Sequence, residues 1–142
     1  MNDAALDVYL LSAAALFFNL VFLVVMIGAT RSKAKAFVNP EDAAAFKGKP
    51  VEQEDPKVTR LLAAHRNALE NIPIFLILAY LHVVTGASKA SAMAYFITFV
   101  ASRWLHSLVY IRGLQPWRTL SYTVGLLAMV GIAVRLVIVA LS

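Results

Sequence analysis

Four long apolar tracts, separated by polar segments, dominate the sequence: Val8 to Ala29, Leu61 to Val84, Ala90 to Ile111 and Leu120 to Leu141. Each is close to the roughly 20 residues that a helix needs to cross a bilayer. The pattern predicts an all-α integral membrane protein with spanning helices over about 8–30, 57–84, 90–111 and 117–141. The second and third connections are short, which makes neighbouring helices antiparallel. We therefore expect one membrane domain, residues 1–142, folded as an up-down four-helix bundle.

The first connection, about residues 31–56, is longer and polar, and the segment NPED within it has the pattern of a helix start. Asn39 is a suitable N-cap, and Pro40 suits the first helical position. Glu41 and Asp42 add the negative charge that stabilises a helix N-terminus. The pattern predicts a short amphipathic helix in this connection.

Composition supports the membrane class and narrows the chemistry. The chain is 61% hydrophobic, whereas soluble domains are about half apolar. It has no cysteine, so neither a disulfide framework nor a cysteine-ligated metal is possible, and a reactive thiol must come from a substrate. Asp3 and Asp7 precede the first tract where a secretory signal needs positive charge, which favours a true span.

Charge in the connections predicts the orientation. Lysines and arginines are concentrated in the first and third connections, whereas the second carries Lys89 alone. The positive-inside rule places these two connections in the cytoplasm and both termini outside, periplasmic or lumenal. A bacterial inner membrane and an endoplasmic reticulum both suit the chain. The net charge of +5 is better explained by anionic lipid headgroups than by nucleic acid, because acidic residues alternate with the basic ones.

Polar side chains interrupt the apolar tracts and form stripes at helical spacing. A charged residue inside a span costs roughly 2.5 to 3.5 kcal/mol on insertion scales, so each one needs a partner or a ligand. Arg66 and Glu70 stand four apart, where an ion pair that fixes helix packing is as good an interpretation as a ligand site. For each residue in the other stripes, taken alone, a role in packing is the favoured interpretation. The polar positions are Arg31, Arg66, Asn67, Glu70, Arg103, His106, Tyr110, Arg118, Ser121 and Tyr122.

The depth of these polar residues in the membrane changes this interpretation. With the orientation above, nearly all of these residues lie in the cytoplasmic half of the membrane, since Glu70 is only about 15 Å along the helix from Arg60. Four helices then contribute polar groups to one layer, in which arginines outnumber glutamate. The pattern predicts a pocket for a small anion. Arg135 lies near the opposite end of its helix, where its head can reach the outer interface.

Four motifs carry a family resemblance. In chain order, they are KAFVNPEDAAAF in the first connection, AAHRNALENI in the second tract, RWLHSLVY in the third tract and WRTLSY in the fourth. They resemble the membrane-associated proteins in eicosanoid and glutathione metabolism, a family that includes microsomal glutathione transferases and microsomal prostaglandin E synthases. The resemblance spans nearly the whole chain.

The resemblance implies a homotrimer that binds glutathione, as co-substrate, between neighbouring subunits at the cytoplasmic leaflet. Glutathione is a net anion at neutral pH and suits an arginine-rich pocket. By position, Arg118 matches the arginine proposed to stabilise the thiolate. The glutathione-binding residues implied in this way, with Ser121 added from its helical stripe, are Arg31, Arg66, Asn67, Glu70, His106, Tyr110, Arg118, Ser121 and Tyr122. Asp42 and Thr119 match positions with possible supporting roles in catalysis.

The implied activity is a glutathione transferase for lipophilic electrophiles, with detoxification as its role and glutathione peroxidase as a further activity. The first alternative is a glutathione-dependent isomerase of the prostaglandin E synthase type, and the second is a non-catalytic lipid-binding adaptor. Ala63 departs from the family pattern, because mammalian relatives carry an arginine there, and Thr119 replaces a serine of the synthase. LENIPIF and the region of Arg135 favour the transferase, whereas AHRN favours the synthase.

Overall fold

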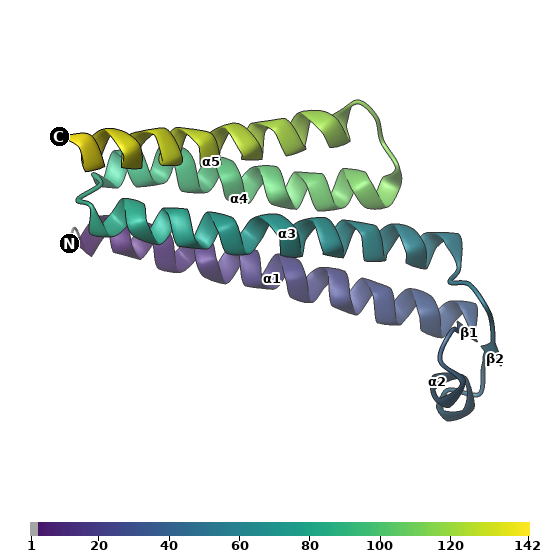
Figure 1. Ribbon diagram of the computed structural model, residues 1–142. Helices are drawn as coiled ribbons and strands as arrows, with labels where there is room; N and C mark the ends of the chain where they lie inside the picture. The colour runs from purple at the N-terminus through teal and green to yellow at the C-terminus, as the bar shows by residue number, and fades with distance from the viewer. Residues whose placement is uncertain (1–2) are drawn as a thin grey trace.

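The computed structural model describes residues 3–142, which are almost entirely helical. The elements are α1 (Asp3–Ala34), β1 (Ala36–Phe37), α2 (Pro40–Ala45), β2 (Lys49–Pro50), α3 (Pro56–Val84), α4 (Lys89–Arg112) and α5 (Trp117–Leu141). The four long helices run side by side (Figure 1), and both marked chain ends lie at the same end of the assembly. The expected all-α class is confirmed.

Local chemistry explains where the long helices begin and end. Asp55 precedes α3 and accepts a hydrogen bond from the backbone N–H of Lys57 at 2.8 Å. Ser88 caps α4 in the same way, accepting from the N–H of Ser91 at 3.2 Å. Gly113 ends α4 with φ of 70°, a left-handed conformation that glycine adopts without steric cost. These caps satisfy backbone groups that a helix end otherwise leaves unpaired.

Aromatic side chains form the centre of the core between α3 and α4. The rings of Phe75 and Phe99 stack with their centroids 3.9 Å apart, and Phe96 meets Phe75 edge-on at 5.6 Å. Leu16 and Leu23 of α1 and Ile132 of α5 are fully buried in the same cluster. All four long helices therefore share one core, whereas many apolar side chains on their outer faces are exposed, as suits contact with lipid.

Within the described residues, three helices are long and apolar enough to cross a membrane: α1, α3 and α5. α4 does not reach that apolar composition, because it carries Arg103, His106 and three serines, most of them buried inside the bundle. A fourth membrane span thus stays a prediction, although α4 packs among the three others.

The first connection forms a small lobe at the end of the bundle opposite the chain termini (Figure 1). The expected short helix is present as α2, with Asn39 at its N-cap and Pro40 as its first residue. The capping bond itself is absent, because the side-chain nitrogen of Asn39 donates to Asp42 Oδ2 at 3.1 Å. The pairing of β1 with β2 as two short parallel strands was not expected from the sequence.

Candidate functional site

Polar side chains of α3, α4 and α5 meet inside the lobe end of the bundle. Arg103 of α4 is only 2% exposed, and its Nη1 donates to Asn67 Oδ1 of α3 at 3.0 Å. Its guanidinium also lies 5.6 Å from the ring centre of Phe99 and 5.5 Å from that of Tyr122. Its Nε has no hydrogen-bond partner among residues 3–142. A buried cation is therefore held by one amide and two rings, with no carboxylate beside it in the described chain.

His106 connects α4 to the start of α5. Its Nδ1 lies 3.1 Å from the carbonyl oxygen of Arg118 and 3.3 Å from Ser121 Oγ. Because a carbonyl only accepts, Nδ1 carries the hydrogen, and the neutral ring then presents Nε2 as an acceptor. That Nε2 is buried, and no described residue bonds to it. Unpaired buried polar atoms are uncommon, so His106 Nε2 and Arg103 Nε both point to a ligand or to water in this layer.

Two tyrosines surround this histidine. The rings of Tyr110 and His106 meet edge-on with centroids 5.4 Å apart, and Tyr122 lies 6.0 Å from His106 on the other side. The structure thus brings together seven residues, which we call the polar layer: Asn67, Arg103, His106, Tyr110, Arg118, Ser121 and Tyr122.

In the described part of the chain, the partners of the Arg118 guanidinium are neutral groups. The guanidinium lies 4.9 Å from the ring centre of Tyr110. With the Gln115 amide turned so that its oxygen faces Arg118, that oxygen accepts from Nη2 at 2.7 Å and from Nε at 3.1 Å. Arg118 is half-buried and forms no ion pair within the described residues. Its positive charge is oriented but not neutralised.

Three predicted site residues lie apart from the polar layer in this chain. Arg66 and Glu70 are exposed on α3 and, within residues 3–142, make no ion pair or side-chain hydrogen bond. The interpretation of these two as an ion pair that fixes packing within the chain is therefore wrong. Arg31, at the end of α1, forms an ion pair with Glu54 of the connecting segment. The expectation that all four helices contribute to one pocket is thus not met by the single chain.

The two residues with possible supporting roles also lie outside the polar layer. Asp42 belongs to α2 and accepts from Asn39. Thr119 is exposed on the first turn of α5, with its Oγ1 3.1 Å from the side-chain amide of Gln115. Thr119 is therefore linked to the Arg118 guanidinium indirectly, through the Gln115 side chain, whereas Asp42 is in a separate part of the molecule.

Sequence reasoning missed two features. Arg103 was recognised as part of a stripe with His106 and Tyr110 but not as a site residue, although that spacing is the signal that places it in the polar layer. A second polar cluster lies at the other end of the bundle, where Arg135 Nη1 donates to His82 Nδ1 at 3.3 Å. His82 is fully buried and its Nε2 lies 3.0 Å from Ser91 Oγ. Arg135 therefore does not simply extend to the interface.

Comparison with known proteins supplies the family. The model of the MAPEG family matches residues 9–138. The chain belongs to the MAPEG family. This confirms the resemblance seen in the sequence motifs, and the matched region of this MAPEG chain includes every residue of the polar layer.

Individual relatives cover nearly the whole length. The chain is 36% identical to prostaglandin E synthase of Bos taurus over 138 residues, which is 96% of this chain and 90% of the relative. It is 33% identical to prostaglandin E synthase of Homo sapiens over 137 residues, with the same coverage. It is 34% identical to microsomal glutathione S-transferase 1 of Rattus norvegicus over 141 residues, 96% of this chain and 91% of the relative. This MAPEG chain is thus similar to two kinds of enzyme to almost the same degree.

Proposed function

We propose that this protein is a membrane-bound glutathione transferase, in which Arg118 stabilises the glutathione thiolate for attack on lipophilic electrophiles. The observation that carries the proposal is the arginine-rich polar layer, whose guanidinium groups have only neutral partners in the described chain. Uncompensated cations in a partly enclosed site favour an anionic ligand. Glutathione has two carboxylates and one amine, so it carries net negative charge at neutral pH.

The exposed pair on α3 supports a site between subunits. Arg66 and Glu70 face away from their own bundle without partners in residues 3–142. They also lie within a helix that is long and apolar enough to cross a membrane. Charges that face lipid are costly, so this face of α3 needs cover from protein. We propose a homotrimer in which Glu70 binds the amine of glutathione, and Arg66 and Arg31 bind its carboxylates, beside the neighbouring polar layer.

The orientation predicted from charge belongs to the same proposal. The bundle crosses the membrane four times as a single domain, with both termini outside and the lobe in the cytoplasm. The polar layer then lies beneath the cytoplasmic surface, where water-soluble glutathione enters from one side and lipophilic substrates enter from the bilayer.

The chemistry requires little from the protein beyond electrostatics. A free thiol has a pKa of about 8.5, so a fixed guanidinium beside it raises the thiolate fraction at neutral pH. The thiolate attacks the electrophilic carbon, a carbon–sulfur bond forms, and a group such as chloride leaves with the bonding electrons. With a hydroperoxide, the thiolate attacks oxygen, and a second glutathione completes reduction to the alcohol and water, giving glutathione disulfide.

A groove beside the polar layer suits the lipophilic partner. It has a volume of about 430 Å³ between α4 and α5, and apolar side chains including Leu105, Leu120 and Val124 line most of it. Ser121, whose hydroxyl contacts His106, also lines this groove. An apolar substrate there would lie next to the layer that holds the thiolate.

Similarity to prostaglandin E synthases favours a second candidate, a glutathione-dependent isomerase that acts on an endoperoxide. Stoichiometry separates the candidates. Conjugation consumes one glutathione per product, peroxide reduction consumes two and releases disulfide, and isomerisation consumes none.

The experiment gives the purified protein glutathione with a chlorinated nitroaromatic, a lipid hydroperoxide or a prostaglandin endoperoxide, and measures glutathione consumed per product. We expect conjugation of the nitroaromatic with one-to-one stoichiometry. Turnover of the endoperoxide alone would contradict the transferase proposal and favour the isomerase. No turnover of any of the three substrates would favour a lipid-binding adaptor.

A further inference from the structure

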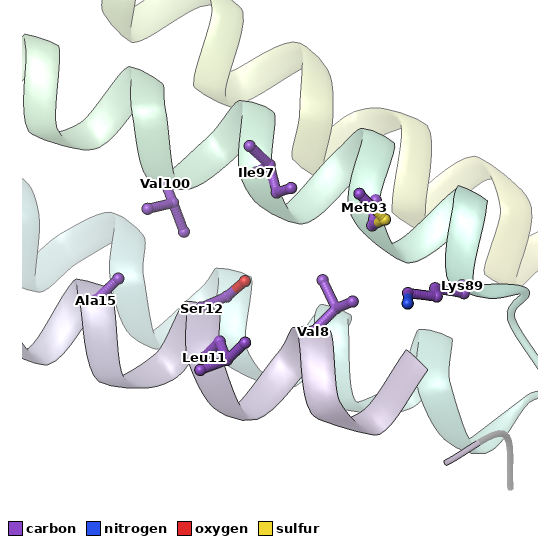
Figure 2. Close-up of a pocket in the computed structure, with 8 residues that line it drawn as sticks. All are labelled: Val8, Leu11, Ser12, Ala15, Lys89, Met93, Ile97 and Val100. Carbon is purple, nitrogen blue, oxygen red and sulfur yellow. The ribbon is translucent and has the colours of Figure 1, made fainter. Parts of the chain in front are cut away.

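A groove between α1 and α4 lies toward the end of the bundle where α4 begins (Figure 2), and its lining residues are separate from the seven residues of the polar layer. Its volume is about 360 Å³. Apolar side chains make up most of its walls, among them Val8, Met93, Ile97 and Val100. Among the described residues that line it, Ser12 and Lys89 are the polar ones, and the proposed reaction uses neither of them.

Ser12 is the unusual member of this lining. The residue is only 5% exposed, and its hydroxyl, which makes no hydrogen bond within residues 3–142, keeps access to the groove. Figure 2 shows its oxygen directed into the space between the two helices. A hydroxyl on an apolar surface finds few hydrogen-bond partners. A ligand with an acceptor at this position would supply one.

A hydrogen bond joins α1 and α4 just beyond the inner end of the groove. Trp104 of α4 donates from its indole Nε1 to the carbonyl oxygen of Ala15 at 3.1 Å, which bridges the two helices just past Val100. Phe22 packs against the same indole, with ring centroids 5.7 Å apart. From Lys89 to Val100 the groove extends for about 17 Å along α4. It is an apolar surface groove with a charged residue at one end.

Lys89 supplies that charge. It is exposed at the first position of α4 and forms no ion pair in the described part of the chain, although Asp3 and Asp7 lie on α1 at the same end of the bundle. Figure 2 shows its ammonium group near Val8, and Ser12 lies one helical turn, about 5 Å, further into the groove. A cation at the mouth, a hydroxyl donor one turn deeper and apolar walls beyond match the order of groups along a phospholipid.

We propose that this groove binds one acyl chain of an anionic phospholipid, with the phosphate at Lys89 and an ester carbonyl that accepts a hydrogen bond from Ser12. The chain lies along Ile97 and Val100 and ends at Trp104. A free fatty acid has only one polar end, so it would satisfy Lys89 or Ser12 but not both. The inference does not depend on the proposed reaction with glutathione.

The test measures lipid binding by native mass spectrometry of the full-length protein in mild detergent, titrated with phosphatidylglycerol, phosphatidylcholine or palmitate. We expect tightest binding of phosphatidylglycerol. Lys89→Gln should weaken it about fivefold, because a lysine near a lipid surface contributes about 1 kcal/mol. Lys33→Gln removes the same charge at the opposite end of the bundle and should leave binding unchanged. Ser12→Ala should weaken both phospholipids but not palmitate.

A steric pair tests the groove itself. Ile97→Trp fills the groove and should abolish the tight binding of phosphatidylglycerol. Leu108→Trp places the same ring on α4 outside the groove and should leave phospholipid binding unchanged. Both residues are partly exposed, so both variants keep the core, and unchanged thermal unfolding verifies this. Equal binding by the two tryptophan variants, or equal binding of the two phospholipids before and after Lys89→Gln, would overturn the proposal. Palmitate binding more tightly than phosphatidylglycerol would also overturn it.

Discussion

Arg103 donates a hydrogen bond to Asn67 across 3.0 Å, and this bond joins α4 to α3 within the polar layer. Arg103 is almost fully buried, and its other neighbours in the described chain are rings and not carboxylates. The amide of Asn67 is therefore the main polar partner of a buried cation. A helix pair joined in this way positions the next two turns of α4, which carry His106 and Tyr110.

The bond between Arg103 and Asn67 predicts a stability effect. Asn67→Ala leaves the guanidinium buried without its amide partner, and a hydrogen bond to a charged group contributes about 1.5–3 kcal/mol. We expect the free energy of unfolding in detergent micelles to fall by that amount. Gln53→Ala, an exposed change in the lobe, is the control. A loss no larger than that of the control would mean that water or lipid replaces the amide.

Close contact between α4 and α5 predicts a second effect. A Cβ added at Gly125 would lie 2.6 Å from Ser102 Oγ and 3.3 Å from Arg103 Nε, so Gly125→Ala should push the helices apart and cost about 1–3 kcal/mol. Gly28 has nothing within 4 Å of the same added atom, and Gly28→Ala should stabilise α1 by about 0.5–1 kcal/mol. Thermal unfolding of both variants measures the difference. The same shift in both would contradict the packing at Gly125.

The exposed charges on α3 predict separate effects on binding and stability. Glu70→Gln and Arg66→Ala should each weaken glutathione binding about tenfold, the effect of losing one charge-assisted hydrogen bond. Neither should lower the melting temperature of the protein, because neither side chain has a partner within the described chain. Isothermal titration and thermal unfolding of the same samples give the two values. Parallel losses would show that these residues serve assembly and not the ligand.

A site shared between subunits predicts complementation. Chains carrying Glu70→Gln and chains carrying Arg118→Ala should each be poorly active alone. When they are co-expressed, some sites combine an intact Glu70 from one chain with an intact Arg118 from its neighbour, and part of the activity returns. If each site lay within one chain, every site in the mixture would stay defective. Tagged co-purification verifies that mixed assemblies form.

Much of the fold followed from the sequence, because hydrophobic tracts of membrane length and capping residues act locally. α3 and α5 end where their apolar tracts end, and NPED forms the expected short helix. The pairing of β1 with β2 joins residues far apart in the lobe and has no local signal in two-residue strands. The absence of the Asn39 capping bond also depended on a competing neighbour, Asp42.

The candidate site was less predictable, for a physical reason. Helical periodicity determines which residues share a stripe, but it does not determine which neighbour that stripe faces. His106, Ser121 and Tyr122 face the interior of the bundle, whereas Arg66 and Glu70 face outward on the helix that also directs Asn67 inward. Arg31 could not be placed, because its partner Glu54 comes from an irregular connection 23 residues away.

The most direct test of the proposed function measures the thiolate of bound glutathione by its ultraviolet absorbance, in the native protein and in Arg118→Ala. Arg112→Ala, which removes an exposed arginine at the end of α4, is the control. Removing one donor that stabilises developing negative charge typically lowers kcat about 10²- to 10³-fold. We expect Arg118→Ala to lose the thiolate signal and to lower kcat by this factor, while glutathione still binds and Arg112→Ala behaves as the native protein. An unchanged thiolate signal and full activity in Arg118→Ala would contradict the account.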